Sequence, residues 1–101
     1  MTVDRSQVNL ELGQVVATPA ALKAFETAGE NPGIFLERHR RGYWGDVCPE
    51  DFLANERALK DGSRLLSVYK LRDGTKVWIM TEAIGDDGHR ASTCVLLPED
   101  Y

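Results

Sequence analysis

The feature that most constrains this fold is a pair of alternating segments on either side of the dipeptide Asp73-Gly74. Residues 64–71 and 76–82 alternate apolar and polar side chains, which is the period of a β-strand with one exposed face. An Asp-Gly pair favours a two-residue hairpin turn with positive φ at both centres. A looser turn at 85–88 precedes a third strand-like run at 91–97. The C-terminal part therefore predicts a three-stranded antiparallel meander.

Three segments upstream begin at prolines and have the period of helices. Thr18 and Asn31 can cap a helix, and each precedes a proline at the first helical position, where a missing N–H costs nothing. The third segment begins at Pro49 and has acids in its first turn. The expected helices run over residues 19–28, 32–41 and 49–61.

These elements define an α+β fold, because a meander has an apolar face to bury and amphipathic helices can cover it. We predict an antiparallel sheet of three to four strands, covered on one face by about three short N-terminal helices. A β-branched run at 12–17 is the candidate fourth strand, although no residue fixes its partner or register. The 101 residues suffice for one core, so we expect a single domain over 1–101 with a flexible segment at 1–9.

Composition and charge narrow the class of protein. With 43% hydrophobic and 28% charged residues, the chain has the make-up of an ordinary folded domain. The net charge of -4 disfavours nonspecific coating of nucleic acid, which depends on clustered Lys and Arg. Neither a signal peptide nor a membrane span is recognisable, so we expect a cytoplasmic protein that does not bind membranes. Cys48 and Cys94 are then expected to be reduced thiols.

The densest cluster of polar and aromatic residues connects the second and third predicted helices. Its candidate binding residues are His39, Arg40, Arg41, Tyr43, Trp44 and Asp46. One hypothesis is a pocket for an anion or a nucleotide, with charge from the arginines and stacking on the indole. The alternative is structural: the two aromatic rings fill the gap between the helices, the basic residues complement the helix dipole, and the aspartate caps the turn.

Trp78 is a further candidate binding residue. In the predicted hairpin it shares a face with Lys76 and Met80, whereas Val77 and Ile79 point to the other face and are typical of a core. The Trp78 face is therefore either exposed or covered by a helix. An exposed Trp beside Met would form an interaction patch, and a covered one would only contribute packing.

The sequence has no recognisable catalytic, metal-binding or phosphate-binding motif, so we expect no catalytic residues, no metal and no cofactor. The remaining catalytic hypothesis is a small hydrolase or nuclease that uses His39, Asp46 and Glu56 as acid and base. Glu56 lies on the apolar face of the third predicted helix, where a carboxylate reaches solvent or meets a cation such as Arg64.

Several segments along the chain carry a family resemblance. They are LGQVVATP (12–19), WGD (44–46), NE and AL (55–56 and 58–59), DGTKVWIMTEA (73–83) and LLPEDY (96–101). Together they resemble a family of small bacterial proteins catalogued as plasmid-related or hypothetical, some of which carry the name of a type I restriction enzyme modification subunit. The resemblance implies a bacterial, cytosolic protein that can travel with mobile DNA, and it brings no established activity.

The restriction name does not fit this sequence. A methyltransferase subunit needs a cofactor-binding α/β fold with a glycine-rich first turn, which these 101 residues lack. The turn at 84–90 is also longer than the family pattern, which leaves His89 without support from the resemblance.

The leading expectation is a noncatalytic protein-interaction or regulatory domain. The predicted helices and sheet carry aromatic side chains that could lie at the surface, and the sequence has no recognisable set of catalytic residues. Its partner would be another protein or a second copy of itself. The acidic charge suits a basic partner, and Tyr43, Trp44 and Trp78 are the expected anchor. Nucleic-acid or anion binding through residues 39–46 is the second hypothesis, and a small hydrolase or nuclease is the third.

Overall fold

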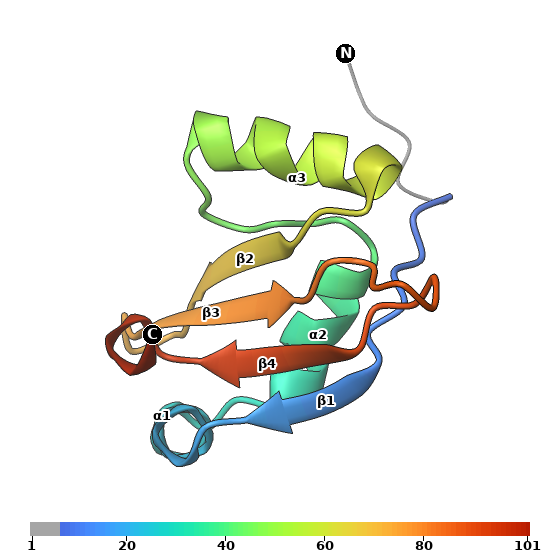
Figure 1. The fold of residues 1–101 in the computed structure, drawn as a ribbon. Helices are drawn as coiled ribbons and strands as arrows, with labels where there is room; N and C mark the ends of the chain where they lie inside the picture. Colours follow the sequence, from blue (N-terminus) through green and yellow to red (C-terminus); the bar gives the residue numbers. More distant parts are fainter. Residues whose placement is uncertain (1–6) are drawn as a thin grey trace.

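The structure, a computed structural model, describes residues 7–101 and contains three α-helices and four β-strands within that range (Figure 1). In chain order the elements are β1 (Gln14–Ala17), α1 (Pro19–Ala28), α2 (Pro32–Arg40), α3 (Pro49–Asp61), β2 (Leu65–Lys70), β3 (Lys76–Thr81), β4 (Ser92–Leu96) and the short 3-10 helix η1 (Pro98–Asp100). The predicted α+β class is confirmed. Residues 1–6 of the segment predicted to be flexible lie outside the described residues.

The four strands form one sheet in the order β1-β4-β3-β2 (Figure 1). β2 pairs antiparallel with β3, and β3 pairs antiparallel with β4, which confirms the predicted meander. β1 is the fourth strand and pairs parallel to β4, with Val16 opposite Cys94. A parallel pair needs a long crossover connection, and the helices and strands between β1 and β4 supply it.

The β2–β3 hairpin lies where the sequence predicts, but the predicted turn type is wrong. Gly74 has a φ of 90°, whereas Asp73 is not among the residues with positive φ. Three residues separate the paired Leu71 and Thr75, whose backbone hydrogen bond measures 2.8 Å. The Asp73 carboxylate accepts the Thr75 N–H at 3.0 Å, so a side-chain bond closes the turn in place of a second left-handed residue. The result is a three-residue loop with one left-handed glycine.

The helices begin and end where the capping signals predict. The Thr18 hydroxyl accepts a backbone N–H at 3.1 Å at the start of α1, and the Asn31 side chain accepts one at 2.8 Å at the start of α2. All three helices have proline in their first turn. Left-handed glycines follow α1 and α3, at Gly29 and Gly62.

One face of the sheet, the inner face, packs against α1 and α2. Phe25 of α1 lies 5.6 Å from Phe35 of α2 between ring centroids, and Phe35 lies 5.3 Å from Tyr69 of β2. The buried residues of this core are Ala21, Phe25, Ala28, Phe35, Tyr69, Leu71, Val77, Ile79 and Val95. The core-facing side predicted for the hairpin is therefore confirmed.

Helix α3 lies along the edge of the sheet beside β2 (Figure 1). The Asn55 side chain donates to the Leu66 carbonyl at 2.7 Å and accepts the Leu66 N–H at 3.1 Å. Asn55 thus acts as the neighbouring strand that β2 lacks on this side. Ala58 packs with Leu65 and Trp44 in a second core cluster. Two helices cover the inner face, and the third closes an edge.

The loop between α2 and α3 closes the same edge further along β2. The Trp44 carbonyl accepts the Val68 N–H at 3.0 Å, and the Asp46 N–H donates to the Val68 carbonyl at 2.7 Å. Gly45 between them has a φ of 76°, and a Cβ at this position would lie 2.0 Å from the Val68 carbonyl oxygen. Only glycine permits this close approach of the two backbones.

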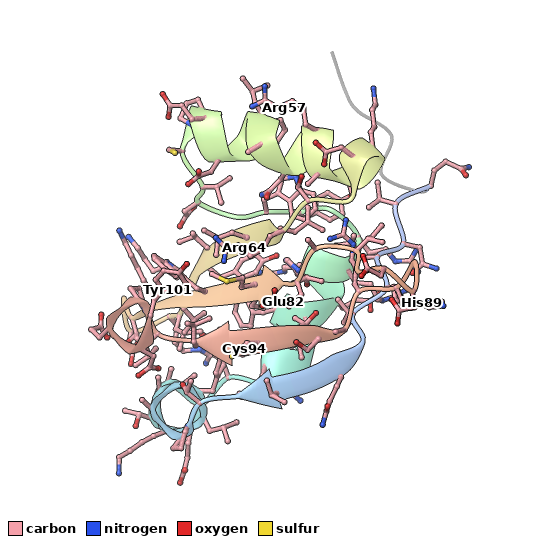
Figure 2. All side chains as sticks on the ribbon, in the orientation of Figure 1. Arg57, Arg64, Glu82, His89, Cys94 and Tyr101 are labelled. Atoms are coloured by element: carbon pink, nitrogen blue, oxygen red, sulfur yellow. The ribbon has the colours of Figure 1, made fainter. Side chains whose placement is uncertain are left out.

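The opposite, outer face of the sheet is apolar in its middle. Alternation along β2, β3 and β4 places six side chains here: Leu66, Val68, Trp78, Met80, Cys94 and Leu96. These six are half-buried except the buried Leu96, and Val16 of β1, opposite Cys94 on the same face, is exposed. No α-helix within residues 7–101 lies in front of this face; the short η1 contacts β3 at one end of it. Figure 2 shows Cys94 on the face, with Tyr101 near that end.

Candidate functional site

The structure places the residues predicted at 39–46 in three different environments. His39 and Trp44 are buried, with 0% and 2% of their surface exposed. Arg40 and Arg41 lie at the surface in contact with an acid, as described below. Tyr43, at 55% exposure, and Asp46 face solvent. The segment is therefore not one continuous binding surface.

His39 is held in the core by hydroxyl groups from two strands, and a hydroxyl from a third strand continues the chain of hydrogen bonds. Its Nδ1 lies 2.6 Å from Ser67 Oγ on β2, and its Nε2 lies 2.8 Å from Thr81 Oγ1 on β3. Thr81 Oγ1 lies 2.7 Å from Thr93 Oγ1 on β4. Thr93 Oγ1 donates in turn to the Leu12 carbonyl at 2.8 Å. A single chain of hydrogen bonds thus crosses the sheet beneath α2.

These contacts fix the proton positions, because each hydroxyl has only one hydrogen to donate. Thr93 uses its hydrogen on the Leu12 carbonyl, so Thr81 must donate to Thr93. The Nε2–H of His39 must then donate to Thr81, and Nδ1 accepts the hydroxyl of Ser67. The chain of bonds therefore selects the neutral tautomer of His39 that carries its hydrogen on Nε2.

Burial keeps His39 uncharged. Desolvation, assisted by the nearby positive charge of Arg90, lowers the pKa of His39 to about 4. The Arg90 guanidinium is itself held by backbone carbonyls, since it donates to Ser63 at 2.7 Å and to Glu82 at 2.9 Å. A third bond, to the Ala58 carbonyl at 3.1 Å, caps the end of α3. His39 thus joins α2 to the sheet, and Arg90 joins the end of α3 to the segments that follow α3 and β3.

The pairing of His39 with Ser67 has the spacing of a base and a nucleophile, but both side chains have 0% exposure. Hydroxyls of the protein occupy both imidazole nitrogens, so His39 is not placed to take a proton from a substrate. Glu56, named in the hydrolase hypothesis, accepts the Trp44 indole N–H at 2.8 Å. This geometry favours structural roles for His39 and Trp44.

Arg40 and Arg41 share one acid at the end of α2. Arg40 Nη2 lies 2.6 Å and Arg41 Nε 3.2 Å from Glu37 Oε1, and hydrogen bonds from both lower the pKa of Glu37. Arg40 also donates to the side chain of Asn9, and its carbonyl accepts the Leu10 N–H at 2.9 Å. Arg40 thus ties Asn9 and Leu10 of the N-terminal segment to the helix, whereas Arg41 bonds to Glu37 within the same helix.

Tyr43 and Asp46 line a groove at the edge of β2. It consists of two adjoining hollows of about 250 and 400 Å³ that share Phe35, Arg38 and Lys70 as lining residues. We call it the basic groove, and its charged lining residues are Arg38, Lys70, Arg72, Glu30 and Asp46. Its cations come from α2 and from the end of β2, and only Tyr43 and Asp46 among the residues predicted to bind belong to it.

Trp78 lies at the centre of the outer face. The ring of Tyr101 stands edge-on to its indole, with centroids 5.7 Å apart. Lys70 and Lys76 are directly opposite each other at one end of this face. Arg64 precedes β2 and Glu82 follows β3 at the opposite end of these strands. Figure 2 shows both side chains on the side of the sheet that faces the viewer, with Arg64 over β2. The sequence pattern predicted the shared face of Lys76, Trp78 and Met80, which the register confirms.

A scan against family models and searches of curated proteins and of solved structures found no match to this chain. The resemblance to plasmid-related proteins therefore stays a prediction. Within residues 7–101, no helix is long and apolar enough to cross a membrane, and no three His, Cys, Asp or Glu side chains are grouped to hold a metal ion. Cys48 and Cys94 are free thiols.

Proposed function

We propose that this chain is a noncatalytic protein-binding domain and that the outer face of the sheet is its binding surface. The observation that carries the proposal is the apolar centre of that face, which no α-helix within residues 7–101 covers. A bacterial origin, a cytoplasmic location and a link to plasmids belong to the same proposal and rest on the sequence alone.

The chemistry of the outer face supports protein binding. Trp78 supplies a large, rigid contact area, and Met80 beside it adapts its shape to a partner. Together with Leu66, Val68 and Cys94 they form a patch on neighbouring strands. Contiguous apolar patches on a small protein usually mark binding surfaces.

The charges around the patch indicate what kind of partner would fit. Along β2 and β3 and the residues next to their ends, three cations border the patch, Arg64, Lys70 and Lys76, against one acid, Glu82. We therefore infer a partner protein with an apolar contact area and an acidic rim, which replaces the basic partner suggested by the net charge of the whole chain. A second copy of this chain would be a competing occupant.

The proposal is tested by affinity capture from a bacterial lysate with the wild-type protein, with Met80→Lys and with the matched control Leu53→Lys. Leu53 is 59% exposed on α3, away from the outer face. A buried lysine at an interface centre should reduce retention of a specific partner by about tenfold or more. The control should retain the partner like the wild type.

The retained protein is then purified and titrated into the isotope-labelled domain, followed by amide and indole NMR signals. Shifts confined to β2, β3 and β4 positions of the outer face, including the Trp78 indole, are expected. Equal retention by Met80→Lys, or shifts that map to another surface, would show that the outer face is not the binding surface. Sedimentation at increasing concentration identifies a second copy as the occupant.

A further inference from the structure

The basic groove suits a different kind of ligand from the outer face. It lies at the β2 edge where the loop after α2 and the end of α2 meet the strand. Its lining combines cations with aromatic side chains, and an apolar protein surface would leave those charges unpaired. A small anion with a planar ring matches this lining better.

Two cations of the groove are available to a ligand. No ion pair within residues 7–101 engages Arg38 or Lys70. The Arg38 guanidinium lies 5.1 Å from the centroid of the Phe35 ring, which orients it. Arg72 is partly matched by Glu30, whose carboxylate accepts the Arg72 N–H at 2.8 Å and lies 3.7 Å from Arg72 Nε.

The backbone of β2 adds a hydrogen-bond donor to these cations. Outward-facing backbone groups on this edge belong to alternate residues, because the groups in between bond to β3. Those of Leu66 bond to Asn55, and those of Val68 bond to the loop at 44–46. The next outward N–H is that of Lys70, which lines both hollows of the groove and has no backbone partner within residues 7–101.

The other end of the groove suits a ring with amino or hydroxyl groups. Tyr43 is 55% exposed and presents its ring for stacking. Asp46 lines the same hollow and can accept hydrogen bonds from such groups. The two hollows, about 250 and 400 Å³, are together in the size range of small-molecule sites.

We propose that the basic groove binds a mononucleotide, with its phosphate at Arg38, Lys70 and Arg72 and its base against Tyr43. The net charge of -4 and the small number of cations argue against a long nucleic-acid strand as the ligand. This inference does not rest on protein binding by the outer face, because Arg38, Arg72 and Tyr43 are not on that face. Lys70 belongs to both surfaces, so Arg38→Gln is the variant that separates the two proposals.

The test is an NMR titration of the labelled full chain with AMP, with inorganic phosphate and with adenosine, each to about 10 mM. AMP should shift the amides of Tyr43, Lys70 and Arg72 and the Arg38 Nε–H. Phosphate alone should shift the signals at the cationic end, more weakly, and adenosine should shift mainly Tyr43. If inorganic phosphate caused the same shifts as AMP, the groove would bind phosphate alone, and the proposal of a nucleotide site would be contradicted.

Arg38→Gln and Arg41→Gln form a matched pair, since both remove one arginine near the end of α2 and only Arg38 lines the groove. Arg38→Gln should weaken AMP binding by about tenfold, and Arg41→Gln should leave it unchanged. Lys70→Gln is the second variant and should also weaken binding. Equal loss in Arg38→Gln and Arg41→Gln, or no shifts at the groove, would overturn the proposal.

Discussion

Lowering the pH from 7 to 4 is expected to reduce the free energy of unfolding by about 3 kcal/mol through His39 alone. The unfolded chain binds a proton on this imidazole below pH 6.5, whereas the folded protein, with a pKa of about 4, does not. Stability from His39 is therefore complete above pH 6.5 and is lost as the pH falls towards 4. Urea unfolding at several pH values measures the effect.

The control is His39→Gln, which keeps a polar side chain in the core but does not titrate. It loses hydrogen bonds to Ser67 and Thr81 at every pH, so it should be less stable than the wild type at pH 7. The stability difference between the two proteins should shrink by about 3 kcal/mol between pH 7 and pH 4. If the difference in the free energy of unfolding stayed constant across this range, His39 would not be a buried, uncharged imidazole in the folded protein.

Replacing Gly45 by alanine is expected to cost about 3 to 5 kcal/mol or to prevent folding. The new Cβ would lie 2.0 Å from the Val68 carbonyl oxygen and 2.8 Å from the Tyr69 ring, and the φ of 76° is unfavourable for alanine. The loop would have to leave the β2 edge and release both hydrogen bonds to Val68. Thermal unfolding followed by circular dichroism gives the change.

Gly74→Ala is the matched control, because Gly74 also has a positive φ of 90° but has open space around the position of a Cβ. It should cost only the backbone strain, about 1 to 2 kcal/mol. If the two variants were equally stable, the contact between the loop and β2 would not contribute to folding, and the edge of the sheet would be open there.

The helices and the hairpin could be predicted from the sequence because their signals are local. Caps such as Thr18 and Asn31 act within three residues, and the alternation in β3 fixes which side of the strand is buried. The turn at Asp73 was predicted with the wrong type, because the side-chain bond to Thr75 offers the chain an alternative to a second positive φ. Propensity rules for the dipeptide do not include that bond.

The partners of the buried residues could not be predicted, because they come from distant parts of the chain. His39 bonds to side chains 28 and 42 residues away, and Trp44 to Glu56 of the next helix. The basic and aromatic segment at 39–46 is continuous in the sequence, but in the folded protein some of its residues are buried and others are exposed. Two cations of the basic groove, Arg38 and Lys70, are brought together by the packing of α2 against β2, which no local pattern signals.

The central claim, that the sheet has an open apolar face around Trp78 while Trp44 is enclosed, is tested most directly with a soluble paramagnetic probe. Line broadening of the two indole N–H signals and of the Met80 methyl would be measured as the probe concentration rises. Strong broadening of Met80 and of Trp78, with Trp44 nearly unaffected, is the predicted result. Equal protection of both indoles would contradict the open face and, with it, the proposed binding surface.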